Sequence, residues 1–183
     1  LYQCRGLPDA DMGGGIDPFM RVRFGGELDK TETVYANNDP MYYKTFRLGG
    51  SESKSTIYAP TDNNLLQQVN LQVFDEDLGG FDEDYIGMLF HKFVDSEVQT
   101  ARLNSSGELE VVNNLGEVIT DTMEPPRPVW QVLFEEEIND DGTTDCEGEV
   151  LASFQLIRIS EDCKGKKLPE PPSIQPDFRE AAV

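Results

Sequence analysis

Short apolar runs with a two-residue period, separated by turns rich in Gly, Pro and Asn, constrain the fold of this chain more than any other feature. The run PFMRVRF at 18–24 places Arg21 and Arg23 on one side and apolar residues on the other. Successive side chains of a strand point to opposite faces, so this alternation predicts a half-buried strand. Patterns with the spacing of an amphipathic helix are scarce. The sequence therefore predicts an all-β protein.

Eight runs of this kind are expected to form strands, at 1–5, 18–24, 30–36, 41–48, 66–74, 85–93, 129–134 and 149–159. Eight strands with turns between them are typical of an antiparallel Greek-key β-sandwich. Two long insertions follow the fourth and sixth strands: a polar one at 48–65, and one at 94–128 that is either locally ordered or disordered. The Pro-rich end predicts an extended linker, so we expect a domain at 1–160 and a linker at 161–183.

Composition narrows the classes of function. The formal net charge of −20 excludes ordinary nucleic-acid binding, which needs clustered Lys and Arg. No run approaches the roughly 18 apolar residues of a membrane span, and the chain opens in a strand-like run rather than a signal peptide, so we expect a piece of a larger protein. Cys4, Cys146 and Cys163 lack CxxC spacing and His91 is the only histidine. We therefore expect free thiols in the cytosol and no zinc site.

Acidic residues are concentrated in loops that the strand count places at one end of the sandwich. When successive antiparallel strands alternate in direction, the loops after the first, third, fifth and seventh strands emerge together. Those loops are 6–17, 36–41, 75–84 and 135–148. The two long insertions leave from the opposite end. This partition predicts a functional end.

Carboxylates in glycine-bearing loops indicate calcium, which takes roughly 6–8 oxygen ligands at about 2.3–2.6 Å. Asp75 and Asp77 lie two apart at the end of a strand and project from the same face. Glycines at 13–15 and 79–80 permit the positive-φ turns that fold a loop around an ion. Two carboxylates about 4 Å apart repel by on the order of 4 kcal/mol at an effective dielectric of 20. The alternative is that these aspartates only form turns and caps; acidic positions in two converging loops favour the metal.

The runs GLPDADMGGGIDPFMRV, NNDPMYYKTF and VFDEDLGGFDEDYIG resemble, in order and spacing, those of calcium-binding C2 domains. The resemblance implies five acidic ligands, which fall on Asp11, Asp17, Asp75, Asp77 and Asp84. The third loop is one residue longer than the family pattern. Asp82 and Glu83 therefore stay open as alternatives for the fifth ligand.

The last run, GEVLASFQLI, resembles the final strand of central C2 domains of ferlins, where it precedes a Pro-rich linker. With LYQCR first, this order implies type II topology, in which both chain ends lie away from calcium. Ferlins are large tail-anchored proteins with several C2 domains on the cytoplasmic side of membranes, implicated in calcium-triggered vesicle fusion, exocytosis and membrane repair. The resemblance implies a phospholipid-binding module in membrane trafficking, with other C2 domains of the parent chain and fusion machinery as further partners.

Calcium is expected to switch the docking of these loops on an anionic membrane. At a leaflet near −30 mV, each loop carboxylate costs roughly 0.7 kcal/mol, and two or three calcium ions reverse that sign. Apolar loop tips that enter the interface contribute roughly 1.5–3 kcal/mol each. The expected tips are Met12, Leu78 and Phe81, although Phe81 has the alternative of folding back on the loop base. A basic patch for phosphoinositide headgroups has as candidates Arg21, Arg23, Lys30 and Lys44, for which simple solvation is the alternative.

The acidic loop at 135–149 attracts calcium but opposes an acidic membrane, and it does not match an EF-hand. It is either a solvated loop or a regulatory one. A calcium-independent protein-interaction module is therefore the rival to a calcium switch. An enzyme is not expected, because His91 has no Ser or Cys partner in a recognisable motif.

Overall fold

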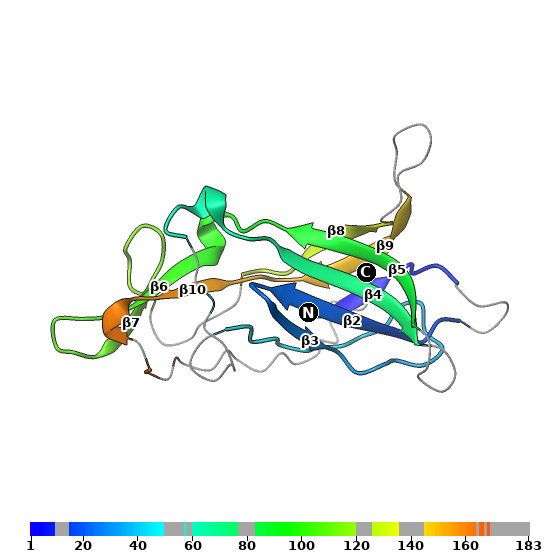
Figure 1. Ribbon diagram of the computed structural model, residues 1–183, viewed down its shortest axis with the longest axis horizontal. Helices are drawn as coiled ribbons and strands as arrows, with labels where there is room; N and C mark the ends of the chain where they lie inside the picture. The colour runs from blue at the N-terminus through cyan, green and yellow to red at the C-terminus, as the bar shows by residue number, and fades with distance from the viewer. Residues whose placement is uncertain are drawn as a thin grey trace.

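The computed structural model describes residues 1–9, 15–49, 57, 60–76, 83–119, 126–135, 145–163, 165–166 and 168. Their strands are β1 (Gln3–Arg5), β2 (Pro18–Phe24), β3 (Glu27–Lys30), β4 (Val69–Glu76), β5 (Glu83–His91), β6 (Val98–Leu103), β7 (Leu109–Val112), β8 (Val129–Phe134), β9 (Cys146–Ala152) and β10 (Leu156–Ile159). Three single-turn 3-10 helices accompany them: η1 (Asn63–Leu65), η2 (Asp95–Glu97) and η3 (Glu161–Cys163). The all-β prediction is confirmed (Figure 1). In this described part, no helix is long and apolar enough to cross a bilayer.

Seven strands form one antiparallel sheet in the order β1-β9-β8-β5-β4-β2-β3. The chain after β3 reaches from one side of this sheet to the other. Thr31 N–H donates to the carbonyl of Met20 in β2 at 2.9 Å, and Cys4 N–H in β1 donates to the carbonyl of Pro40 at 2.9 Å. The sheet is therefore curled, with the segment 31–40 joining its two sides.

The alternation expected for 18–24 determines which face of the sheet is buried. Met20, Val22 and Phe24 are buried, whereas Arg21 and Arg23 lie on the other face. Further strands add to the same core Cys4, Val69, Leu71, Val73, Leu133 and Val150. Because a fully buried side chain of this kind contributes about 1.5–3 kcal/mol, this inner apolar face is the main stabilising feature of the sheet.

The expected count of eight strands is wrong, because part of the predicted insertion at 94–128 is ordered. It contains β6 and β7, which form a three-stranded sheet with β10 at the left end of Figure 1. β10 pairs with β6 in parallel, and Ala101 and Val111 are the buried residues of a small second core. The single strand expected at 149–159 is also wrong. The chain leaves the large sheet after Ala152 and enters the small one at Leu156.

His91 lies where the chain crosses between the two sheets. Its ring stacks on Phe154 with centroids 3.8 Å apart, and its Nε2 is 2.8 Å from Oε2 of Glu97 in η2. Its Nδ1 is 3.3 Å from Oε1 of Gln131 in β8. The only histidine of the chain thus connects β5 and β8 of the large sheet with η2, which leads into β6.

Two further strand predictions differ from the structure. The strand expected at 30–36 is wrong, because β3 spans Glu27–Lys30 and shares only Lys30 with it. The next backbone N–H groups that bond to β2 and to the segment before it belong to Thr31, Val34 and Asn37, three residues apart instead of two. The strand expected at 41–48 reduces to one bridge between Met41 and Gln3. Tyr43 adopts φ +45°, which lies outside the extended region and prevents a regular strand there.

The domain boundary expected after residue 160 stays a prediction. Cys163, just beyond it, is 1% exposed, and Ser160 N–H donates to the carbonyl of Ala101 at 3.0 Å. Residues 169–183 of the predicted linker lie outside the described residues. Packing of η3 against β6 therefore extends the ordered structure at least to Cys163.

Candidate functional site

Carboxylates face each other on two successive pairs at the end of β4 and the start of β5. Asp75 is the register partner of Asp84, and Glu76 is the register partner of Glu83. Like charges directly opposite each other on neighbouring strands are destabilising. Successive strand residues point to opposite faces, so the aspartate pair and the glutamate pair lie on different sides of the sheet. Each side therefore requires compensation of its own.

On the glutamate side, the compensation comes from neighbouring strands and loops. Arg21 Nη2 in β2 forms an ion pair with Glu83 Oε2, and Thr33 Oγ1 donates to Glu76 Oε2. The Arg21 guanidinium also lies over the ring of Phe74, 4.3 Å from its centroid. A cation and a hydroxyl donor thus offset the repulsion between the two glutamates.

On the aspartate side, backbone N–H groups contact the carboxylates. Asp75 is 2% exposed, and its Oδ1 accepts the N–H of Asp17 at 2.6 Å. Asp17 Oδ1 in turn accepts the N–H of Ala36 at 2.7 Å. Ala36 has φ +50°, in the left-handed region that costs a non-glycine residue roughly 1–2 kcal/mol. This chain of hydrogen bonds joins the three segments that contain Asp17, Ala36 and Asp75.

Two side chains for which the sequence predicted no role, those of Asn38 and Asp39, bind the loop at 36–41 to the loop at 6–17. Asp39 Oδ1 accepts the N–H of Gly6 at 2.8 Å. Asn38 Nδ2 donates to the carbonyl of Leu7 at 2.9 Å and to Oδ1 of Asp9 at 2.7 Å. The sequence feature that could have indicated this role is the Asn-Asn-Asp-Pro turn at 37–40, since Asn and Asp side chains bind nearby backbone groups.

Three of the predicted calcium ligands are described, namely Asp17, Asp75 and Asp84, as is the alternative Glu83. The other ligand candidates and the membrane-inserting tips lie outside the described residues: Asp11, Met12, Asp77, Leu78, Phe81 and Asp82. Within the described ranges, no three His, Cys, Asp or Glu side chains come together closely enough to hold one ion. The donors that are present are carboxylate oxygens, which is the chemistry that calcium prefers. The ligand set as a whole stays a prediction.

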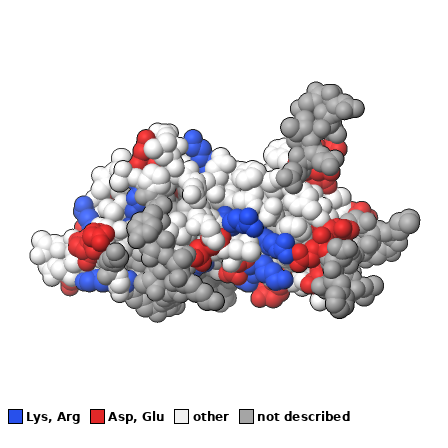
Figure 2. Space-filling view, in the orientation of Figure 1, with Lys and Arg blue, Asp and Glu red and all other residues white. Residues whose placement is uncertain are grey.

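The predicted basic patch lies on the outer face of β2 and β3, where Figure 2 shows Lys and Arg side chains gathered beside acidic ones. Arg21 is the cross-strand partner of Lys30, and Arg23 follows on the same face. Lys44 Nζ donates to the carbonyl of Lys30 at 2.6 Å and is 3.7 Å from a carboxylate oxygen of Glu32. The four basic residues are neighbours, but the side chains of Arg21 and Lys44 already bind other groups of this chain.

The base of the loop between β8 and β9 lies back from the carboxylate pairs. Phe134, the last residue of β8, pairs with Met88 of β5. Met88 is four residues beyond Asp84, which corresponds to about 13 Å along a strand. The acidic loop at 135–148 therefore starts further from Asp75 than the loops at 6–17 and 36–41 and the loop that begins at Asp75 itself.

Glu147 in β9 provides a pH-dependent test of the charges at the base of this acidic loop. Burial first, and then the charges of Glu135 and Asp145, raise the pKa of its carboxyl. Because the folded-state pKa is raised, the contribution of this group to stability is present below the unfolded pKa and is lost as pH rises through the folded one. We expect Glu147→Gln to stabilise the domain at pH 7 by at most about 1 kcal/mol, since such charges are partly screened. The difference from wild type should close as pH falls towards about 4.

Thermal melts of Glu147→Gln and wild type from pH 7 to pH 4 measure this. The matched control is Glu32→Gln, which removes a carboxylate that is 85% exposed. A stabilisation by Glu147→Gln that is the same at both pH values would contradict the assignment.

A family model, a curated relative and two solved structures resemble this chain. A family model described as the C2 domain matches residues 1–106. The chain is 26% identical over 89 residues to "Multiple C2 domain and transmembrane region protein 8" of Arabidopsis thaliana, which covers 49% of this chain and 8% of that protein. The chain thus spans less than a tenth of the curated relative's length.

Among solved structures, the chain resembles a tandem pair of C2 domains from Extended-Synaptotagmin 2, with 14% identity and a TM-score of 0.45, over 83% of this chain and 38% of that one. It also resembles a C2 domain of plant Extended Synaptotagmin 1, with 16% identity and a TM-score of 0.43, over 85% of this chain and 91% of that one.

Proposed function

The chain belongs to the C2 domain family, a family of binding modules, and from this premise we propose that it binds calcium at the β2–β4–β5 end and thereby docks on anionic phospholipid membranes. The observation that supports this best is the opposed pair Asp75 and Asp84, with Asp17 hydrogen-bonded to Asp75. Directly opposed carboxylates on the aspartate side are stabilised by a cation. When bound, calcium supplies positive charge and coordination positions for phosphate oxygens.

The structure discriminates between two of the three candidates for the fifth ligand, Asp84 and Glu83, whereas Asp82 lies outside the described residues. Glu83 lies on the side of Arg21 and forms an ion pair with it, whereas Asp84 lies on the side of Asp75. We therefore propose Asp84 rather than Glu83. The proposed set is completed by Asp11 and Asp77.

The narrower assignment to a ferlin-like protein is also a proposal. Type II topology is supported by β1, the first strand, which pairs antiparallel with β9, a strand near the end of the chain. The name of the Arabidopsis relative, with several C2 domains and a transmembrane region, supports a place in a larger membrane protein. Calcium-regulated vesicle fusion, exocytosis or membrane repair at the cytoplasmic side of a membrane is the process we propose.

Co-sedimentation with liposomes tests the proposed function. We expect the domain to pellet with phosphatidylcholine–phosphatidylserine vesicles in calcium, and to stay in the supernatant in EGTA or with phosphatidylcholine alone. Asp75→Asn combined with Asp84→Asn should abolish the calcium-dependent fraction. The control is Asp95→Asn, a single charge change in η2 at the opposite end. Equal pelleting in calcium and in EGTA would rule out the switch.

A calcium-independent protein-interaction module is the second candidate, and exposed aromatic residues favour it. Phe90 in β5 is 55% exposed and Phe134 in β8 is 45% exposed, and Phe134 pairs with Met88 on the neighbouring strand. A contiguous exposed apolar patch marks a contact surface, and Phe90 and Phe134 are the candidates for the centre of such a patch. Under this alternative, the liposome assay gives no pelleting in either condition.

A further inference from the structure

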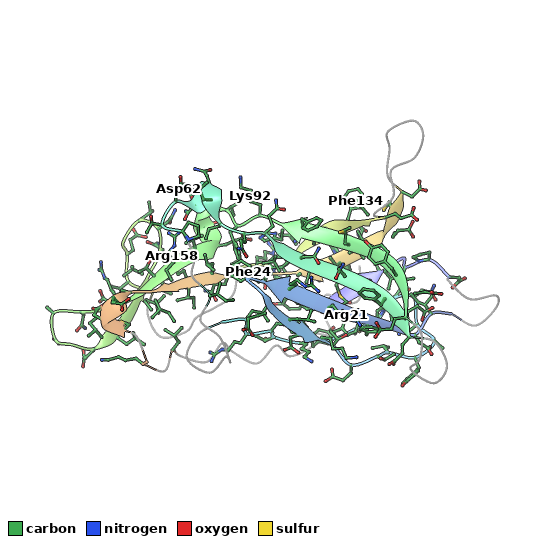
Figure 3. The ribbon with its side chains drawn as sticks, in the orientation of Figure 1. Arg21, Phe24, Asp62, Lys92, Phe134 and Arg158 are labelled. Atoms are coloured by element: carbon green, nitrogen blue, oxygen red, sulfur yellow. The ribbon has the colours of Figure 1, made fainter. Side chains whose placement is uncertain are left out.

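Arg21 reaches from the middle of β2 to the first residue of β5. β4 lies between these two strands in the sheet, so the side chain crosses β4 to meet Glu83. It crosses over the ring of Phe74, 4.3 Å from the centroid, and its guanidinium is 5.3 Å from the centroid of Phe19. Figure 3 shows Arg21 towards the end of the molecule away from Arg158 and Asp62. One side chain thus connects the outer faces of three strands.

The surroundings of Arg21 hold its side chain in this position. Phe74 stacks on Phe19 with centroids 5.5 Å apart and meets Tyr85 edge-on at 5.7 Å. The cross-strand pair Phe74 and Tyr85 is the neighbour, along the strands, of the pair Asp75 and Asp84. A guanidinium stacks on aromatic rings while its N–H groups bind a carboxylate, which a lysine ammonium does not reproduce. The Arg21 side chain is only 27% exposed as a result.

The ion pair has a direct consequence for Asp84. Glu83 faces Glu76, and the pairing of Arg21 with Glu83 offsets that repulsion. Without the guanidinium, the first residue of β5 is pushed away from β4. Asp84 is the next residue along the chain and has to stay opposite Asp75 if both are to bind one ion. The position of a proposed ligand therefore depends on the charge balance of the opposite face.

We propose that Arg21 is a positioning residue of the calcium site, which holds the start of β5 on β4 through Glu83, and is not a lipid-headgroup contact. This inference rests on the proposed function, since it concerns the same site. For the removal of Arg21, the proposal predicts a change in calcium affinity opposite in sign to the change that simple electrostatics predicts. Removal of a positive charge near the site on its own strengthens calcium binding, whereas loss of positioning weakens it.

Isothermal titration of calcium without lipid tests the proposal. We expect Arg21→Gln to bind calcium about tenfold more weakly than wild type, which corresponds to roughly 1.4 kcal/mol. The matched control Arg23→Gln, with the same charge change two residues along the same face, should stay within about twofold of wild type. The double variant Arg21→Gln with Glu83→Gln has the net charge of the wild type and lacks the repulsion. It should recover binding to within about twofold of wild type, because the carboxylate that needs neutralising is gone.

When the wild type binds calcium, two outcomes would overturn the proposal. In the first, Arg21→Gln binds calcium as tightly as Arg23→Gln. In the second, Arg21→Gln loses only vesicle binding, which assigns Arg21 to headgroups. If wild type itself gives no calcium heats, the proposed function fails, and hydrogen exchange of the amides of Glu83–Tyr85 then tests positioning alone. Faster exchange in Arg21→Gln than in Arg23→Gln supports the positioning role, and equal exchange refutes it.

Discussion

Saturating calcium is expected to raise the melting temperature of the domain by about 5–10 °C. A ligand that binds only the native state at about 100 times its dissociation constant stabilises it by about 2.7 kcal/mol. For a domain of this size, each kcal/mol shifts the melting temperature by roughly 2–4 °C. Scanning calorimetry in calcium and in EGTA measures the shift.

Asp75→Asn should remove most of that increase. The asparagine keeps an oxygen that can accept the N–H of Asp17, so the hydrogen bond seen at 2.6 Å can persist while the charge is lost. In EGTA the variant should melt no lower than wild type, because the repulsion between Asp75 and Asp84 is relieved. Asp95→Asn, at the other end, should keep the full calcium shift. A full shift in Asp75→Asn would contradict the ligand assignment.

Gly148→Ala is expected to destabilise the domain by about 3 kcal/mol or more, through strain and overpacking together. Gly148 has φ +98°, a conformation that residues with a Cβ rarely adopt. A Cβ there would lie 2.7 Å from the carbonyl oxygen of Arg5 and 2.9 Å from that of Gly6. Both are backbone atoms, so no change of rotamer relieves the contact. We expect loss of pairing between β1 and β9, measured as a lower urea midpoint.

Gly107→Ala separates the steric effect from the effect of φ. Gly107 has φ +79°, and no atom would lie within 4 Å of a Cβ there. This variant should lose only about 1 kcal/mol, the usual strain of a residue in the left-handed region. Equal destabilisation by the two substitutions would contradict the proposed clash at Gly148.

Local patterns made a large part of this fold predictable. The two-residue period of 18–24 indicated which side of β2 is buried, because the direction of a strand side chain depends only on its position in the run. Strand counting assigned four acidic loops to one end, and this is confirmed for segments of three of them, at 6–17, 36–41 and 75–84. The structure brings the segments around Asp17, Ala36 and Asp75 together there.

Pairings between distant segments were not predictable in the same way. The run 149–159 has one continuous apolar pattern, yet it is divided between two sheets, since β10 pairs with β6 from the middle of the chain. Nothing local to Arg21 distinguishes it from Arg23. Phe74 and Glu83 are far from both arginines along the chain. Only the strand order brings them within reach of Arg21.

The sequence by itself determined the β class, the buried face of β2 and the carboxylate-rich end, because composition and side-chain alternation are properties of single segments. The tertiary structure alone decided the division of the described residues into ten strands, the opposition of Asp75 with Asp84, and the separation of Glu83 onto the side of Arg21. These depend on register, and register follows from hydrogen bonds between strands that lie far apart in the chain.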